Sequence, residues 1–407
     1  MSTVTIERAN HNRQLPEGWR WVALGEVCQI IAGQSPVSET YRKTPGGLPF
    51  FQGKADFGNR HPVARTWCIE PTKVAQAGDI LISVRAPVGP TNVADVECGI
   101  GRGLAAIRTG IHADRDFVLA ALRLYEDTLA ELGSGSTFEA IKRDDLESLE
   151  IPLPPLAEQK RIVAILNEQM AAMARARVAA EVQLEATKAL PAAYLLAVFN
   201  SHEAQQWPKK RLGELAAIGP DNGVFKRRHE FGRGVPIVNV SDLYRSLAVD
   251  LNSVERVEAS DYEQRRYAIA SGDLFFCRSS LKREGIGWCC YVSEVSEPAI
   301  FDCHVMRVRL DPEKACSEYV AHYWAHPAVR ERVIGNSRTA TMTTMNQDDL
   351  AEVNIPLPPL SEQRRIAARL SEQMASVEQT RKALEDQLTT INKLPAALLR
   401  QAFNGAL

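Results

Sequence analysis

The stretch IPLPPLAEQKRI, from Ile151 to Ile162, returns almost unchanged as IPLPPLSEQRRI, from Ile355 to Ile366. The two copies lie 204 residues apart in a chain of 407. The match resumes downstream at the same offset, where LPAAYLLAVFN at 190–200 corresponds to LPAALLRQAFN at 394–404. Because one offset of half the chain relates both pairs, the sequence predicts a tandem duplication.

Fainter matches precede each copy in the same order. They are LGE at 24–26 and 212–214, GDIL at 78–81 with GDLF at 272–275, and DDL at 144–146 and 348–350. The first two matches have offsets of about 187 to 194, whereas DDL already has the offset of 204, so the extra residues of the second half lie inside its upstream segment. Each half therefore consists of a variable segment followed by a constant one.

This layout, and the I-P-L-P-P-L-x-E-Q string in particular, closely resembles the specificity subunits of type I restriction-modification systems over essentially the whole chain. The resemblance implies that each variable segment is a target recognition domain that reads one half of a split DNA sequence. It also implies that the constant segments are helices that join the two halves. We accordingly expect target recognition domains at 1–155 and 201–359, and constant helices at 156–200 and 360–407.

The constant segments have the composition of long helices. From Ala157 to Pro191 the chain loses Gly and Pro and becomes rich in Ala, Glu, Gln, Leu, Met and Arg. This composition predicts one helix of about 33 residues, roughly 50 Å long. In the second copy Ser361 is suited to be the N-cap, and we expect Pro395 to end the helix as Pro191 ends the first.

Apolar residues recur along both helices at spacings of 4 and 3, which is typical of a coiled-coil seam. Because a folded domain separates the copies, the simplest geometry packs the helices antiparallel, with a pseudo-twofold axis near Arg177 and Arg381. The alternative is that each helix packs only on its own domain. The seam positions are Val163, Leu166, Met170, Met173, Arg177, Ala180, Leu184 and Thr187, and Ala367, Leu370, Met374, Val377, Arg381, Leu384, Leu388 and Ile391.

The variable segments, 15–150 and 207–354, predict mixed α/β domains, each with a small sheet. Short β-branched and aromatic runs at 79–84, 286–292 and 305–310 lie between Gly, Pro and Asn turns and favour strands. Helical patterns near 117–132 and 317–333 precede the constant segments. The expected fold class is thus mixed α/β, with two tandem domains each followed by a long helix.

Basic residues of the variable segments cluster on expected loops, where Lys and Arg can contact DNA phosphates and base edges. The hydroxyl-rich stretches 134–137 and 337–344 near the domain ends are suited to phosphate oxygens. The candidate DNA-binding residues are Lys54, Arg60, Arg85, Arg102, Lys142, Lys226, Arg227, Arg228, Arg233, Arg278, Lys282, Arg283 and Arg338, with Arg65 as a further candidate. For any single exposed cation the alternative is an ordinary solvated side chain.

Composition indicates a soluble globular protein, with 45% hydrophobic and 24% charged residues and a net charge of −2. No apolar run approaches a membrane span, and the segment MSTVTIERANHNR is too polar for a signal peptide, so we expect a cytoplasmic protein. The eight cysteines have no C-x-x-C spacing and are expected to be reduced. Cys303-His304 and the pair His322 and His326 lack the third and fourth ligands of a zinc site, so no metal is expected.

Three stretches resemble enzyme motifs but lack residues or spacings that those motifs require. Gly46 to Ala55 is one residue too long for a phosphate-binding loop, and Ala55 stands where magnesium needs a hydroxyl. The tandem prolines lie in Leu-Pro-Pro-Leu, not in the Asn/Asp-Pro-Pro-aromatic motif of adenine methyltransferases. Glu158-Gln159-Lys160 has the E-x-K spacing of a nuclease, but an acidic first helical turn explains it.

The leading hypothesis is therefore a non-catalytic subunit that recognises a two-part, asymmetric DNA sequence, with the helices fixing the spacer. The resemblance implies double-stranded DNA, two modification (methyltransferase) subunits and restriction (motor-nuclease) subunits as partners, and no membrane. It places S-adenosylmethionine, ATP and magnesium in those partners and no cofactor in this chain. Two alternatives remain open: a specificity subunit for a fused methyltransferase-nuclease, and a tandem protein-binding scaffold without DNA contact.

Overall fold

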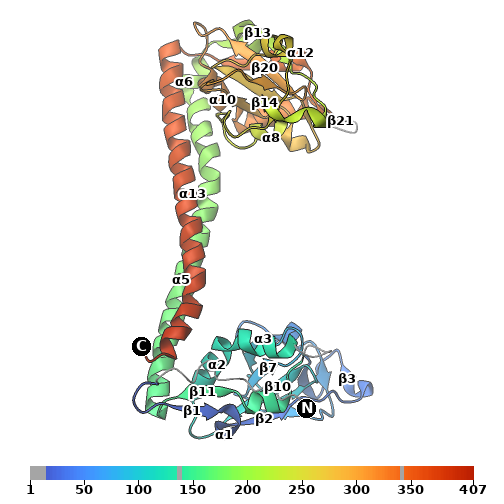
Figure 1. Cartoon of the computed structure of the whole chain (residues 1–407), viewed down its shortest axis with the longest axis vertical. Coiled ribbons are helices and arrows are strands. Elements are labelled where there is room, and N and C mark those ends of the chain that lie inside the picture. Colours follow the sequence, from blue (N-terminus) through green and yellow to red (C-terminus); the bar gives the residue numbers. More distant parts are fainter. Residues whose placement is uncertain (1–14, 135–139, 340–342) are drawn as a thin grey trace. The chain divides into compact units, whose positions relative to one another are not determined.

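The computed structural model describes residues 15–134, 140–339 and 343–407. The chain divides into two compact units, one of Met1–Ala180 with Asp386–Leu407 and the other of Glu181–Glu385. Each unit combines one variable segment with parts of two long helices, α5 (Leu156–Phe199) and α13 (Leu360–Ala402) (Figure 1). Among the described residues, no helix has the length and apolar character needed to cross a membrane.

The first unit is built on an antiparallel sheet of four strands, in the order β2 (Cys28–Ala32), β10 (Leu104–Thr109), β7 (Ile80–Ser83) and β8 (Thr91–Val93). A second sheet has the order β3 (Tyr41–Arg42), β5 (Trp67–Cys68), β4 (Leu48–Phe51), β9 (Cys98–Ile100) and β6 (Val74–Ala75), with β4 and β9 parallel. Strand β1 (Arg20–Ala23) pairs with β11 (Glu150–Leu153). The helices are α1 (Leu24–Val27), α2 (Arg115–Leu124), α3 (Glu126–Ser134) and α4 (Arg143–Glu147).

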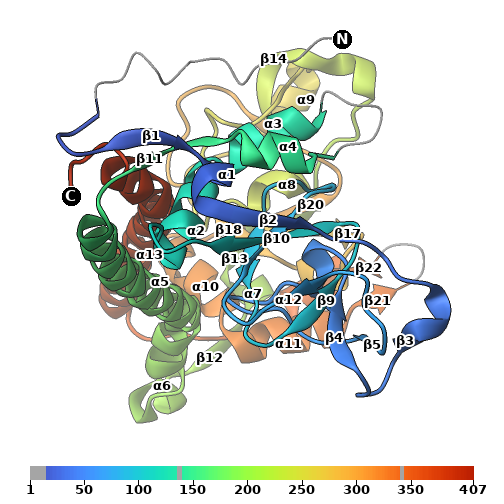
Figure 2. The same ribbon diagram turned by 90° about the horizontal axis from the view of Figure 1, so that it is seen from below.

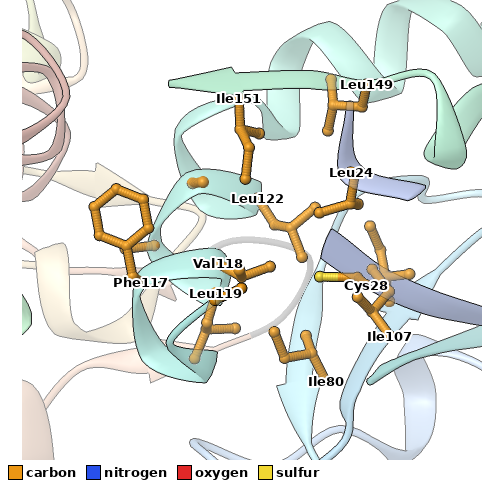
Figure 3. Close-up of a cluster of buried hydrophobic side chains, with 14 of the residues drawn as sticks. Leu24, Cys28, Ile80, Ile107, Phe117, Val118, Leu119, Leu122, Leu149 and Ile151 are labelled. Carbon is orange, nitrogen blue, oxygen red and sulfur yellow. The ribbon is translucent and has the colours of Figure 1, made fainter. Parts of the chain in front are cut away.

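The core of the first unit lies between helix α2 and the four-stranded sheet. Val118 and Leu122 of α2 point toward Ile80 of β7 and Ile107 of β10, and all four are fully buried (Figure 3). The two central strands are buried on both faces, because Leu81 of β7 and Ala106 of β10 belong to a second apolar cluster. The apolar face of α2 explains the packing on the first face, since removing apolar surface from water is the main driving force of folding.

The second unit repeats this plan. Its antiparallel sheet has the order β13 (Ala216–Asn222), β20 (Val305–Leu310), β16 (Asp273–Cys277) and β18 (Cys289–Tyr291). Three smaller groups are β15 (Arg256–Val257), β14 (Phe231–Val238) and β19 (Ile300–Phe301); β17 (Ser279–Ser280), β22 (Thr343–Thr344) and β21 (Arg338–Thr339); and β12 (Lys209–Arg211) with β23 (Asn354–Pro356). The helices are α6 (His202–Gln206), α7 (Leu212–Leu215), α8 (Val240–Leu243), α9 (Asp261–Arg266), α10 (Ser317–Trp324), α11 (Pro327–Gly335) and α12 (Gln347–Ala351).

The strands predicted at 79–84, 286–292 and 305–310 appear as β7, β18 and β20, and the mixed helix and strand fold is confirmed. Each helical pattern is divided into two helices. The first breaks at Tyr125, and the second at His326, whose ring accepts a hydrogen bond from Ala328 N–H as an N-cap. Pro327 has no N–H to continue the preceding helix, which explains the second break.

The repeated GD motif at 78–79 and 272–273 has the same structural role in both units. Asp79 accepts two hydrogen bonds from Arg108 at 3.0 and 2.8 Å, and Asp273 accepts two from Arg309 at 2.6 and 2.9 Å. Both aspartates are buried and also accept a backbone N–H three residues upstream. A buried carboxylate needs such partners, so the GD motif marks the same polar anchor at the start of β7 and β16.

The glutamine of the repeated string is buried in both copies. Gln159 Oε1 accepts the N–H of Asp114 at 2.7 Å, and its amide nitrogen donates to the carbonyls of His112 and Pro154. Gln363 repeats the arrangement with Cys316 N–H and the carbonyls of Lys314 and Pro358. Each glutamine therefore fixes the first turn of a long helix to the loop that precedes α2 or α10.

The long helices do not end at their prolines, so that expectation was wrong. Pro191 lies inside α5 and Pro395 inside α13. A proline leaves one backbone carbonyl unpaired and costs about 3 kcal/mol inside a helix. The residues beyond each proline offset this cost by burial: Leu195, Val198 and Phe199 in the second unit, and Leu398, Leu399, Ala402 and Phe403 in the first.

Within each unit the two helices run antiparallel. In the first unit the beginning of α5 lies beside the end of α13 (Figures 1 and 2), and Arg161 donates to the carbonyl of Leu407 at 2.7 Å. In the second unit Phe199 near the end of α5 and Ile366 near the start of α13 belong to one core. The seam positions are buried or half-buried on both helices, except that Arg177 is exposed.

Candidate nucleic-acid interface

Each unit has a hollow at the same place in its fold. In the first unit it is lined by residues after β4, residues at the end of β7 and just after it, and the turn that joins β9 to β10. In the second unit the corresponding residues follow β14, follow β16, and form the turn that joins β19 to β20. The equivalence is fixed by hydrogen bonds and not by sequence. Gly101 N–H donates to Phe51 O at 2.8 Å, as Asp302 N–H does to Val238 O at 3.0 Å.

A second set of bonds extends the correspondence. Val84 N–H donates to Gly103 O at 2.9 Å, and Arg278 N–H donates to His304 O at 2.8 Å. The carbonyls of Val84 and Arg278 in turn accept the N–H groups of Ile141 and Met345, both at 3.0 Å. The hollows therefore correspond at Gln52 and Asn239, Arg85 and Ser279, Arg102 and Cys303, and Gly103 and His304. The turn after β4 is one residue longer than the turn after β14. Asp56 N–H donates to Gly53 O as Asp242 N–H donates to Asn239 O, both at 3.0 Å, so Lys54 corresponds to Val240.

The first hollow is cationic and has a volume of about 250 Å³. Lys54, Arg85 and Arg102 reach it from three separate segments, and all three are exposed. Gln52 adds an amide, and Ser35 and Ser83 add hydroxyls. The sequence predicted these three cations individually, and the fold brings them together.

The second hollow is larger, about 750 Å³, and its lining is mostly apolar. Leu281 at its rim is 84% exposed, which is unusual for a leucine. Tyr244 and Trp288 meet edge to face at 5.8 Å, and the Arg330 guanidinium lies 5.3 Å from the Trp288 ring centre. Asn239, Lys282, Glu284 and His304 supply polar groups. Burial raises the pKa of Tyr244 to about 12, so its hydroxyl stays protonated and donates to Gly285 O at 3.2 Å.

Several predicted cations are held by carboxylates. Lys226, whose side chain is 4% exposed, contacts Glu230 at 3.1 Å and Glu263 at 2.8 Å. Arg233 pairs with Glu258, and Arg60 pairs with Asp116 at 3.2 Å. A cation already neutralised at short range offers less to a phosphate, so the dense basic cluster at 226–233 is weaker than its sequence suggests.

The remaining candidates are distributed over both units. Lys142 is exposed at the start of α4, and Arg227, Arg228 and Arg283 are exposed in the second unit. Arg278 donates to the backbone carbonyl of Cys303 at 3.1 Å. Strand β21 begins at Arg338, and β17 and β21 both pair with β22. Residues 135–137 and 340–342 of the hydroxyl-rich stretches lie outside the described residues.

The two histidine pairings differ in their surroundings. His322 and His326 are buried, and His322 Nε2 lies 2.9 Å from Ser371 Oγ on α13. Burial lowers the pKa of His322 to about 4, so it is neutral near pH 7 and joins two helices. Asp302, Cys303 and His304 place a carboxylate oxygen, a sulfur and a ring nitrogen within 4.8 Å of one another, and Asp302 and His304 line the second hollow.

Sequence reasoning missed part of both hollows. Gln52 and Asn239 were not singled out, because a single amide side chain carries no spacing signal. Leu281 and Trp288 were also missed, although the string SSLKREGIGW already places them beside Lys282 and Arg283. An exposed apolar residue among cations would have been the usable signal.

Comparison with known proteins identifies the class. The family model described as "Type I restriction modification DNA specificity domain" matches residues 16–176 and 204–390, one match in each half. The chain belongs to this family, the type I restriction-modification specificity subunits.

Individual relatives agree with this assignment. The chain is 25% identical to the EcoKI specificity subunit of Escherichia coli K12, over 97% of this chain and 90% of that one. It is 48% identical to a putative MjaX specificity subunit of Methanocaldococcus jannaschii, where the match spans 38% of this chain and 37% of that protein. The fold matches a solved chain from work on complex assembly and conformational transition of the type I R-M system, with a TM-score of 0.70, 24% identity, and coverage of 97% and 100%.

Proposed function

We propose that this chain recognises a bipartite, asymmetric DNA sequence, with each domain reading one half-site through its hollow. The observation that carries the proposal is the pair of equivalent hollows, which keep one backbone arrangement and present different side chains. Two domains that dock on DNA in the same way but read different bases need a shared backbone arrangement with different side chains. Contacts to the DNA backbone position the protein, and contacts to base edges determine which sequence is recognised.

In this proposal the two long helices act as the spacer between the half-sites. Their antiparallel packing within each unit supports an antiparallel coiled coil with a pseudo-twofold axis, whose length sets the separation of the two half-sites. Exposed Val178 and Val182 near the middle of α5 offer apolar surface to a partner. Two modification subunits, one for each half, and the restriction subunits are the partners we infer.

The chemistry belongs to those partners in this proposal, and this chain is non-catalytic. S-adenosylmethionine, ATP and magnesium would be bound by the modification and restriction subunits. Methylation of a base within a duplex requires that the base be flipped out of the stack, so the complex would distort the DNA that this chain positions.

Two other functions fit parts of the structure. A fused methyltransferase-nuclease could take the place of separate subunits, and the genes beside this one distinguish that case. A tandem scaffold that binds two copies of another protein would use the helices and leave the hollows without DNA. Unpaired cations in the first hollow favour DNA binding over the scaffold.

The test is methylome sequencing of a strain that lacks modification, supplied with this chain and its modification subunit. We expect a new split motif with methylated adenine in both halves. If the two proteins co-purify as a stable complex and no new methylation appears, the scaffold is the better explanation. Replacing residues 15–150 with the corresponding domain of another family member should then change one half-site and leave the other unchanged.

A further inference from the structure

Three cations, Lys54, Arg85 and Arg102, line the first hollow. This inference rests on the function proposed above and adds the kind of base. We propose that Lys54, Arg85 and Arg102 read guanine in the half-site that the first domain recognises. Their side chains line one hollow although they come from segments after β4, after β7 and between β9 and β10.

Although Lys54 lies within electrostatic range of Glu126, no carboxylate among the described residues neutralises these cations at hydrogen-bonding distance. Within the described part of the chain, none of the three forms an ion pair or side-chain hydrogen bond with a carboxylate. Other cations of the same unit do, for example Arg108 with Asp79 at 2.8 Å and Arg143 with Glu147 at 2.6 Å. Three unpaired charges at one place repel one another, and an electron-rich ligand removes that cost.

Residues at equivalent positions of the two hollows indicate whether a cation contacts a base or a phosphate. Both domains meet the same sugar-phosphate backbone, so a phosphate contact has no reason to change between equivalent positions. At the positions of Lys54, Arg85 and Arg102 the second domain has Val240, Ser279 and Cys303, although the surrounding backbone bonds are kept. Three charges lost at three equivalent positions are expected where two half-sites differ in bases.

The chemistry of the cations selects the base. Lysine and arginine side chains only donate hydrogen bonds, and guanine presents two acceptors, O6 and N7, in the major groove. Adenine presents one acceptor beside an amino donor, cytosine presents an amino donor, and thymine presents one acceptor beside a methyl group, so guanine alone offers two acceptors to a cation. Gln52 beside the cations could accept from a neighbouring adenine.

The experiment removes each charge of the first hollow in turn by substitution with serine. Single variants Lys54→Ser, Arg85→Ser and Arg102→Ser, each in complex with the modification subunit, are examined by methylome sequencing. We expect one or more guanines of the first half-site, on either strand, to become degenerate while the second half-site is unchanged. The domain exchange described above identifies which half-site is the first. Lys73→Ser, an exposed cation of the same domain that does not line the hollow, is the control and should leave the motif intact.

A second measurement needs no variant. Replacing each guanine of the first half-site with 7-deazaguanine keeps base pairing and removes the N7 acceptor. Binding of the wild-type complex should weaken by roughly 5- to 150-fold at a contacted guanine. The variant that lacks the contact should show little further loss at that base.

Three results would overturn the inference. One is a first half-site without a G·C pair, or one insensitive to 7-deazaguanine; the split motif would still stand, so the proposed function would survive. The second is an unchanged motif in variants that bind all DNA sequences more weakly and whose affinity depends less steeply on salt concentration. That result would show that the cations contact phosphates. The third is a change in the second half-site. The absence of any split motif would remove the proposed function as well.

Discussion

Gln159 and Gln363 explain at the scale of a residue why one string occurs twice. Each buried amide satisfies three backbone groups of a loop and a helix start, a combination that few other side chains could reproduce. Glu158 beside the first glutamine pairs with Arg161 at 2.7 Å on the helix surface, as Glu362 pairs with Arg365 at 2.5 Å in the second copy.

Replacing Gln159 with methionine keeps the volume and removes the hydrogen bonds. The N–H of Asp114 and two carbonyls would then be buried without partners, so we expect the free energy of unfolding to fall by about 1–3 kcal/mol. Thermal unfolding measures the change. Gln169→Met, at an exposed position of the same helix, is the matched control, and an equal loss in both variants would contradict the explanation.

His322 predicts a pH dependence of stability. Burial lowers its pKa from 6.5 to about 4 in the folded chain, although Glu318 acts in the opposite direction. Between those values the unfolded chain binds more protons, so this stability is present above pH 6.5 and is lost as the pH falls toward 4. The loss reaches about 3 kcal/mol at most.

Chemical denaturation between pH 7 and pH 4 tests this prediction. His322→Gln is neutral throughout and should flatten part of the slope, while His229→Gln, at an exposed position of the same unit, should not. If the free energy of unfolding changes with pH equally in the wild-type protein and in both variants, His322 is not held in its neutral form by burial.

At the scale of elements, the helices α5 and α13 continue through a proline in equivalent places. The residues after Pro191 and Pro395 carry the contacts that hold each helix end in a domain core: Phe199 meets Tyr319 at 5.7 Å, and Phe403 meets Phe117 at 4.9 Å between ring centres. Local backbone preference is therefore overridden by tertiary burial.

Pro191→Ala should stabilise the protein. The new N–H can donate to the carbonyl of Thr187 and recover most of the helical cost, partly offset by a more flexible unfolded chain, so we expect a gain of about 1–2 kcal/mol. Ala189→Pro introduces the same defect two residues earlier, at an exposed position, and should destabilise by about 3 kcal/mol. A lower melting temperature for Pro191→Ala would mean that the proline fits its site without strain.

At the scale of the whole molecule, the duplicated plan predicts that recognition and spacing are separable. Inserting one heptad in each helix, after Arg177 and after Arg381, keeps the phase of the seam and adds about 10 Å to each helix. The recognised spacer should lengthen while both half-sites stay the same, as methylome sequencing of the variant would show. Altered half-sites would instead indicate that the helices take part in reading bases.

The sequence by itself determined the duplication, the two long helices and the class of protein. These follow from a repeated string, from composition and from the periodic spacing of apolar residues, all of which can be read from the sequence alone. It also named Lys54, Arg85 and Arg102 as candidates, though one by one.

Only the tertiary structure decided which side chains act together. Lys226 and Arg60 look as available in the sequence as Arg85 does, but Glu263 and Asp116 reach them from distant positions of the chain. The hollows likewise join segments whose order along the chain is shared while their lengths differ, so backbone hydrogen bonds and not residue offsets establish which positions correspond. Which charges are paired, and which residues of the two hollows correspond, depend on contacts between segments that are far apart in the sequence. A local sequence pattern does not contain that information.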